Sequence, residues 1–404
     1  MGASAAQAGG PRVVCVFGTR PEAIKMAPVV RALQARPALD VRIVLTAQHR
    51  QLLDQVMEQF GLAADADLDL MRPGQPLEEL TARALLALHA ELGRWSPDLV
   101  LVHGDTTTTL AGALAAFYRR IPVGHVEAGL RSFRLDAPFP EEANRLLTDR
   151  LSALHFAPTP RARQNLLREG IPAEGVLVTG NTAIDALLWT VEHARKADVR
   201  AAERLLGSWS GRLVLAETHR RESWEGAIEE VARAVADAVQ AHSDVLLLYS
   251  VHPNPLVRQA VRRATAGRAR VRLVEPQPYG IWAQLMRRAH LVVTDSGGIQ
   301  EEAPSLHTPV VLAREVSERP EGVEAGTVHL AGTGYEGVRH LVDRLLSDPE
   351  AWRRSAEAPN PFGDGRAAER IAQAVEWRLT GRAPRPEEFR PAPRSPAAGD
   401  GIRL

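Results

Sequence analysis

The feature that most constrains the fold is a regular alternation of short apolar runs with helix-like segments along this chain of 404 residues. Such alternation predicts parallel sheets whose strands are joined by right-handed helical crossovers. We therefore predict an α/β fold of two doubly wound parallel-sheet lobes with a cleft between them. The apolar runs lie at residues 13–17, 41–45, 99–102, 123–126, 213–216, 245–250, 271–274 and 291–294.

The length of the chain and its local composition predict the domain boundaries. A chain of this length exceeds what one ordinary hydrophobic core supports, so we expect lobes at residues 11–180 and 185–358. A last helix within residues 359–382 follows a Gly-containing turn and is expected to pack back on the first lobe. Residues 1–10 and 383–404 are rich in Pro and small residues, and we predict that both tails are disordered.

The overall composition excludes several classes of partner. Lys+Arg and Asp+Glu both number 49, so we expect neither nucleic acid nor an anionic membrane as a partner. The single cysteine, Cys15, excludes a disulfide framework and a cysteine-rich metal site. The N-terminus lacks the features of a signal peptide, and no apolar run approaches the ~20 residues of a membrane-spanning helix. We therefore expect a cytoplasmic protein.

Acidic residues follow two of the predicted strands at the points where these strands end. One apolar run leads into the sequence HGD, which ends at Asp105, and the run at 123–126 leads directly into Glu127. In an open parallel sheet, ligands bind beyond the carboxyl ends of the strands, so both acids are expected in the same crevice. A further acidic pair begins at Glu141. A fold needs no acids at these places, whereas proton-transfer chemistry does.

Two junctions between a strand and a helix have the composition of phosphate sites. In FGTRPEAIKMAP, Arg20 lies just before a helix and Lys25 in its first turns, where charge and the helix dipole can hold a phosphate. In LVVTDSGGIQEEAP, two glycines and the Ser296 hydroxyl form a diphosphate cradle, and Glu302 can accept hydrogen bonds from a ribose diol. The alternatives are an ordinary exposed turn for the first junction and a capped Gly turn for the second.

Isolated histidines and a glycine motif carry weaker signals. His219 and His252 each follow a predicted strand, yet a lone histidine at such a place is structural as often as functional. No histidine pair has the spacing of a metal site such as H-E-x-x-H, so no metal is expected. The motif GTGYEG at residues 332–337 lacks the βαβ unit and the distal acid of a nicotinamide site, so no NAD is expected either.

The chain resembles the non-hydrolysing UDP-N-acetylglucosamine 2-epimerase family from about Val13 to Ile371. The resemblance implies a GT-B-like fold of two Rossmann-like lobes, a homodimer, and cofactor-free interconversion of UDP-GlcNAc and UDP-ManNAc. It also implies elimination of UDP to a 2-acetamidoglucal, re-addition of UDP, and a supply of ManNAc for cell-surface polysaccharide. The motifs that carry the resemblance are FGTRPEAIKMAP, TAQHRQLLDQV, VLVHGDTTTTLA, GHVEAGLRS, PFPEEANR, GNTAIDAL, HRRES, VHPNP, TDSGGIQEEAPSL, ERPEGVEAGT and PNPFGDG.

The resemblance also implies roles for individual residues. The positions matching catalytic residues of the family are Asp105, Glu127, Glu141 and His219. Those matching UDP or substrate contacts are Arg20, Lys25, Gln277, Trp282, Ser296, Gly297, Gly298, Glu302 and Arg319, with Trp282 expected beside the uracil. Those matching a second UDP-GlcNAc site, which acts as an activator in bacterial members, are Gln48, Gln51, Arg220 and His252.

Two other functions use similar sequence features. A GT-B glycosyltransferase has the same kind of UDP cradle, but the three acids and the lack of an evident acceptor-recognition segment favour the epimerase. A catalytically silent sugar-nucleotide sensor is expected to lack the acids, which are present here. The hydrolysing branch of the family is not expected, because the chain has no appended kinase domain.

Overall fold

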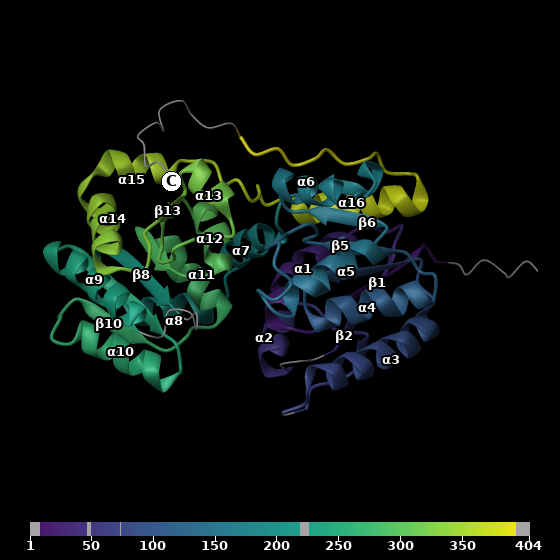
Figure 1. The fold of residues 1–404 in the computed structure, drawn as a ribbon, viewed down its shortest axis with the longest axis horizontal. Helices are drawn as coiled ribbons and strands as arrows, with labels where there is room; N and C mark the ends of the chain where they lie inside the picture. The colour runs from purple at the N-terminus through teal and green to yellow at the C-terminus, as the bar shows by residue number, and fades with distance from the viewer. Residues whose placement is uncertain (1–8, 47–49, 73, 219–225, 393–404) are drawn as a thin grey trace, which may run out of the picture. The chain divides into compact units, whose positions relative to one another are not determined.

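The computed structural model describes residues 9–46, 50–72, 74–218 and 226–392, without the side chains of residues 50–52. The chain divides into two compact units (Figure 1). It passes from unit 1 to unit 2 within helix α7 (Thr182–Glu192) and returns between Phe362 and Gly363. Unit 1 is Met1–Ala186 with Gly363–Arg390, and unit 2 is Leu187–Phe362 with Pro391–Leu404.

Unit 1 is built on a seven-stranded parallel sheet with the order β3-β2-β1-β4-β5-β6-β7. The chain order reverses between β1 and β4, so a topological switch point lies at the carboxyl ends of these two strands. Such a point is where an open parallel sheet most often binds a ligand. The strands are β1 (Arg12–Phe17), β2 (Asp40–Leu45), β3 (Ala66–Asp67), β4 (Leu99–His103), β5 (Val123–Val126), β6 (Leu154–Ala157) and β7 (Val176–Val178).

The helices of unit 1 pack on the sheet through apolar side chains, and a capping box defines the start of α1. Val14, Val16 and Val102 share one buried core with apolar residues of α3 and α4, because successive strand residues face opposite sides of a sheet. Helix α1 begins after Thr19, whose hydroxyl oxygen accepts the Glu22 N–H in a capping box. The helices are α1 (Arg20–Gln34), α2 (Arg50–Phe60), α3 (Leu77–Trp95), α4 (Thr107–Tyr118), α5 (Glu141–Leu151), α6 (Pro160–Arg168), η1 (Ala173–Gly175) and α16 (Ala367–Thr380).

Unit 2 repeats the doubly wound design with a six-stranded parallel sheet in the order β10-β9-β8-β11-β12-β13. Its switch point lies between β8 and β11. The predicted α/β fold with two doubly wound parallel sheets is therefore confirmed. The strands are β8 (Arg212–Thr218), β9 (Val245–Val251), β10 (Val271–Val274), β11 (Leu291–Thr294), β12 (Val310–Leu312) and β13 (Val328–Leu330). The helices are α8 (Lys196–Leu206), α9 (Ala227–Ala241), α10 (Pro255–Thr265), α11 (Tyr279–Arg288), α12 (Gly297–Glu302), η3 (Ala303–Leu306), α13 (Pro320–Ala325), α14 (Tyr335–Ser347) and α15 (Pro349–Ala356).

Helix α16 belongs to unit 1 although it comes near the end of the chain. It packs against α1, and Figure 1 shows it in yellow among the purple and blue elements of the N-terminal half. Arg36, just after α1, forms ion pairs with Glu369 and with Glu376, the latter at 2.7 Å. The first core is therefore completed by a segment that follows the whole of unit 2.

The structure differs from the prediction of a disordered tail over residues 383–390. Phe389 is only 5% exposed, and its N–H donates to the Val178 carbonyl at the sheet edge (2.8 Å). Glu388 forms an ion pair with Arg163 at 2.8 Å. Composition suggested disorder because Pro and small residues dominate, but one buried aromatic and one edge-strand hydrogen bond fix this stretch. Residues 393–404 lie outside the described part of the chain.

Candidate active site

The first two predicted acids lie at the switch-point edge of the unit 1 sheet. His103, the last residue of β4, pairs in register with Val126, the last residue of β5. Gly104 follows with φ of +71° and donates its N–H to the Val126 carbonyl (2.9 Å). Glu127 Oε1 lies 3.9 Å from the point where a Cβ on Gly104 would stand. The Glu127 carboxylate therefore lies beside the turn that carries Asp105.

Three side chains surround the Glu127 carboxylate. Lys25 Nζ of α1 forms an ion pair with Oε2, and the side chains of the two are only 17% and 10% exposed. Asn181 donates its Nδ2–H to the same oxygen (3.1 Å), and His103 Nε2 lies 3.8 Å from it. The sequence predicts a phosphate contact for Lys25, whereas in the structure this residue pairs with an acid.

The backbone of Glu127 has a left-handed conformation, with φ of +67°. Such a conformation costs a residue with a side chain about 1–3 kcal/mol and persists only where the surroundings impose it. Here the N–H groups of Glu127 and Ala128 both donate to the Phe156 carbonyl, at 3.1 and 3.2 Å. Two hydrogen bonds to the neighbouring strand β6 thus hold the acid in its strained position.

His103 is a neutral, buried neighbour of this acid. Burial, with a smaller effect of Lys25, lowers the pKa of His103 to about 3, despite the opposing effect of Glu127. Both ring nitrogens lack a hydrogen-bond partner within the described parts of the chain. His103 therefore stays uncharged at neutral pH.

Helix α5 carries the groups that hold Asp105. Arg145 forms an ion pair with Asp105, and Asn144 donates its Nδ2–H to the Asp105 carbonyl (2.9 Å). Arg145 also contacts the buried Glu142 at 3.1 Å. Glu141, the third predicted acid, is the half-buried first residue of the same helix. The predicted acids thus come from the ends of β4 and β5 and from the start of α5.

A buried network that the sequence analysis missed supports this edge of the sheet. His125 of β5 contacts Asp149 Oδ1 through Nδ1 (2.6 Å) and the Gly104 carbonyl through Nε2 (2.7 Å). Burial alone would raise the pKa of Asp149, but His125 and Arg131 hold it below the usual range. The network fixes the carbonyl of the residue next to Asp105.

A second missed residue is Glu22, buried in the capping box of α1. Its Oε2 accepts the N–H groups of Gly18 and Thr19 at 3.1 and 2.7 Å, and its Oε1 accepts the hydroxyls of Thr106 and Thr109 at 2.7 and 3.2 Å. Burial raises its pKa despite these four donors. Glu22 therefore joins the turn after β1 to the turn after β4, and Arg20 lies exposed at the start of α1 beside it.

The predicted cradle of unit 2 follows β11 at the second switch point. The Ser296 N–H donates to Thr294 Oγ1 (3.0 Å), and α12 begins at Gly297. A Cβ on Gly297 would lie 2.7 Å from Arg319 Nη1, so the Arg319 guanidinium rests against this glycine. Glu301 pairs with Arg319 through Nε. Ser296, Gly297 and Arg319 are therefore brought together, with Gly298 in the same turn.

The remaining predicted contacts of unit 2 are more dispersed. Tyr279 donates its hydroxyl to Glu302 (3.4 Å), and Gln277 donates to the Glu275 carbonyl (2.6 Å). Trp282 packs in the apolar core of unit 2 and is 7% exposed, which leaves little of the ring for the expected contact with uracil.

The predicted second site is described at one residue only. His252, after β9, accepts the Asn254 N–H on Nδ1 (3.2 Å). His219, Arg220 and Gln48 lie outside the described residues, as does the side chain of Gln51.

Over the described ranges, no three His, Cys, Asp or Glu side chains gather as a metal ion would require. Over the same ranges, no helix has the length and apolarity needed to cross a bilayer.

Acids gathered at the switch point of a doubly wound sheet define a class of α/β enzymes that bind ligands at strand ends. The family model of UDP-N-acetylglucosamine 2-epimerase matches residues 31–376. The UDP-N-acetylglucosamine 2-epimerase of Escherichia coli K12 is 49% identical over 370 residues, covering 90% of this chain and 98% of that protein. The Bacillus subtilis 168 protein of the same name is 46% identical over 378 residues, covering 94% of this chain and 98% of that protein.

Solved structures give the same result. The UDP-GlcNAc 2-epimerase of Neisseria meningitidis, solved with UDP-GlcNAc bound, has a TM-score of 0.82 and 42% identity, over 90% of this chain and 99% of that one. The Methanocaldococcus jannaschii enzyme, solved with UDP-GlcNAc and UDP, has a TM-score of 0.75 and 34% identity, over 91% and 99%. The chain therefore belongs to the UDP-N-acetylglucosamine 2-epimerase family, as its motifs predicted.

Proposed function

We propose that this protein interconverts UDP-GlcNAc and UDP-ManNAc by inverting carbon C2 of the sugar. Membership of the family supports the substrate, since relatives bind UDP-GlcNAc and UDP. The observation that carries the chemistry is the placement of Asp105 and Glu127 around Gly104, with Lys25 paired to Glu127.

The chemistry explains why acids and cations are both needed. The C2 proton of a pyranose is not acidic, because no carbonyl adjoins it. It can be removed once the C1–O bond breaks, UDP leaves with the bonding electrons and C1 gains oxocarbenium character. Loss of the proton then gives a 2-acetamidoglucal. UDP attacks C1 again while a proton arrives at C2 from the opposite face.

The acids of unit 1 serve the proton transfers in this proposal. One carboxylate cannot easily reach both faces of the ring, so Asp105, Glu127 and Glu141 act as a set. The resemblance assigns His219, the fourth catalytic candidate, to the departing UDP instead. Each well-placed proton transfer contributes about 10²–10⁴-fold to the rate. We assign Lys25 to the acid set, because its ammonium group pairs with Glu127.

Cations and backbone amides serve the departing UDP. Charge on the leaving diphosphate is best stabilised by groups that are already oriented before the bond breaks. We assign this task to Arg20 in unit 1, and to Ser296, Gly297, Gly298 and Arg319 in unit 2. Glu302 is assigned to the ribose and Gln277 to the nucleotide, while the burial of Trp282 weakens its assignment to the base.

Further parts of the proposal rest on the family resemblance. We propose, as the resemblance implies, a non-hydrolysing enzyme that needs neither NAD nor a metal. Elimination and re-addition of UDP transfer no hydride and consume no water. We also propose a cytoplasmic location and a supply of ManNAc for cell-surface polysaccharide. A second UDP-GlcNAc at Gln48, Gln51, Arg220 and His252 is proposed as an activator.

Incubation with UDP-GlcNAc alone in D₂O tests the function. An epimerase gives UDP-ManNAc that carries deuterium at C2, since the proton is exchanged with solvent between the two steps. The alternative, a GT-B glycosyltransferase, leaves C2 protonated and needs an acceptor. Product without deuterium, or no product at all, would exclude the proposed mechanism.

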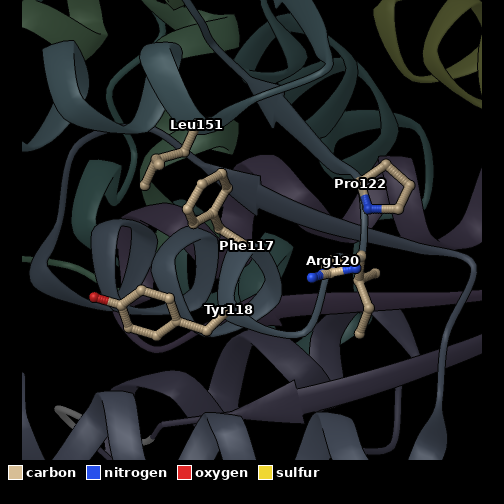
Figure 2. A pocket seen from close by; sticks show the side chains of 6 residues that line it. Phe117, Tyr118, Arg120, Pro122 and Leu151 are labelled. Atoms are coloured by element: carbon tan, nitrogen blue, oxygen red, sulfur yellow. The ribbon is translucent and has the colours of Figure 1, made fainter.

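We propose a homodimer that forms through an apolar surface of unit 1. At the end of α4, Phe117 and Tyr118 are 53% and 60% exposed, and their rings lie 6.2 Å apart between centroids. They line a surface pocket with Leu151 of α5 (Figure 2), and Leu147 of the same helix is 52% exposed. Contiguous exposed apolar side chains of this kind mark protein–protein contacts. The remaining residues of the pocket are Arg120, Ile121 and Pro122.

A further inference from the structure

Two side chains from different segments of unit 1 contact one oxygen of the Glu127 carboxylate. Oε2 contacts Lys25 from α1 and Asn181 from the turn before α7, and His103 of β4 lies 3.8 Å away. An ion pair alone leaves a carboxylate free to rotate about its last bond, because an ammonium group is a point charge. A second, directional donor removes that freedom. Asn181 is such a donor.

The orientation of the Asn181 amide follows from its other partner. Its Oδ1 accepts the N–H of Ala183 at 2.9 Å, and a backbone N–H can only donate. The amide nitrogen must therefore be the atom that faces Glu127. Asn181 is 2% exposed and directly precedes α7, so its oxygen acts as a helix N-cap.

The turn that carries Asn181 is held from a second segment of the chain. A Cβ on Gly363 would lie 3.3 and 3.4 Å from the backbone N and O of Asn181, so this segment packs directly on the turn. Asp185 accepts the N–H groups of Ala367 and Ala368 at 3.2 and 2.8 Å. The position of the amide is therefore set by the N-terminal turn of α7 and the start of α16 together.

We infer that Asn181 is a positioning residue for proton transfer by Glu127. Its amide fixes the rotation of the carboxylate, so that the oxygen which takes or gives the C2 proton keeps one place. The inference rests on the proposed function, because it needs Glu127 to act on C2. A misplacement of about 1 Å in such a group can lower a rate by about 10²-fold.

Two substitutions test the inference while keeping the helix cap. Ser and Asp cap helices about as well as Asn, so both variants keep the cap. Asn181→Ser should fold with little change in Tm, and Asn181→Asp should fold with a lower Tm because two carboxylates then lie together. Asn181→Ser removes the donor, and we expect kcat to fall about 10-fold with KM and UDP affinity within about twofold of wild type. Thr159→Ala is the matched control, since it removes the N-cap of α6 in the same unit. It should lower Tm by a few degrees and leave kcat unchanged.

Asn181→Asp adds a readout that a merely structural role would not move. A carboxylate within hydrogen-bond distance of Glu127 adds a like charge beside this acid, whose described neighbours include Lys25 and neutral His103. Because like charge favours the protonated acid, the acidic limb of the kcat–pH profile should move upward by about one pH unit or more. The Asn181→Ser variant should leave that limb in place.

The outcomes separate this inference from the proposed function. If wild-type enzyme puts no solvent deuterium at C2, the proposed function fails. If wild type exchanges the proton but Asn181→Ser keeps full kcat, the positioning role is refuted. An unshifted acidic limb in Asn181→Asp also refutes it, as does an equal loss of kcat in Thr159→Ala.

Discussion

His103 should make the stability of unit 1 depend on acidity in a calculable way. Its pKa is about 3 in the folded protein, against 6.5 for an ordinary histidine. Between these values the unfolded chain binds more protons than the folded one, so stability falls as pH is lowered through this window. With these two pKa values, lowering the pH from 8 to 5 reduces the free energy of unfolding by about 2 kcal/mol.

His103→Asn should abolish this part of the pH dependence. Urea unfolding at pH 8 and pH 5 measures it, with the transition of unit 1 assigned by proteolytic peptides from residues 9–186. The loss of stability between the two pH values should be about 2 kcal/mol smaller in the variant than in wild type. Comparing the two proteins cancels the contributions of all other titrating groups.

Asp185 provides a control of opposite sign. Burial raises its pKa to about 7, so its contribution to stability is greatest below its unfolded pKa and is lost as pH rises through about 7. In wild type, Asp185 therefore adds stability as the pH falls from 8 to 5. Asp185→Asn removes this gain, so the free energy of unfolding should decrease more on acidification than in wild type. Equal pH dependence in wild type and His103→Asn would show that His103 is not buried as a neutral base, and the description of the Glu127 surroundings would be wrong.

Four further outcomes are expected. Asp105→Asn should lower turnover at least about 10²-fold in steady-state kinetics, with UDP affinity nearly intact in calorimetry. If the variant kept the turnover of wild type, Asp105 would have no part in the mechanism. Glu127→Gly should be more stable than Glu127→Ala by about 1 kcal/mol in urea unfolding, because glycine accepts the positive φ; equal stability would contradict the strained backbone. Phe389→Ala should destabilise unit 1 by up to about 3 kcal/mol, whereas no change would show that the segment does not pack as described. Phe117→Glu should convert the proposed dimer to a monomer in analytical ultracentrifugation, and a persistent dimer would place the interface elsewhere.

The sequence predicted the positions of the acids better than their partners. Asp105 and Glu127 could be placed together because parallel strands deliver their carboxyl ends to one edge of a sheet. That rule needs only local periodicity. The pairing of Lys25 with Glu127 depends instead on the side from which α1 approaches the strand ends, and periodicity does not report it.

The supporting residues were missed for a related reason. His125 and Asp149 are 24 residues apart, and nothing in the local pattern of either segment indicates that they meet. Glu22 read as an ordinary first-turn acid of a helix, because its two threonine donors come from the distant β4–α4 turn. A polar residue within an otherwise apolar strand, such as His125, was the one available signal.

Unit 1 consists of two stretches of the chain that are translated at well-separated times. Between Ala186 and Gly363 lie 176 residues, 187–362, all of which are translated before α16. At roughly 5–20 residues per second, a ribosome needs roughly 10–35 s for that stretch. During that interval residues 187–362 of unit 2 are made, while α1 and the turn at Asn181 still lack the segment that packs on them. The N-terminal part of unit 1 therefore leaves the ribosome with an uncovered apolar face, and this face is covered only after α16 has been translated.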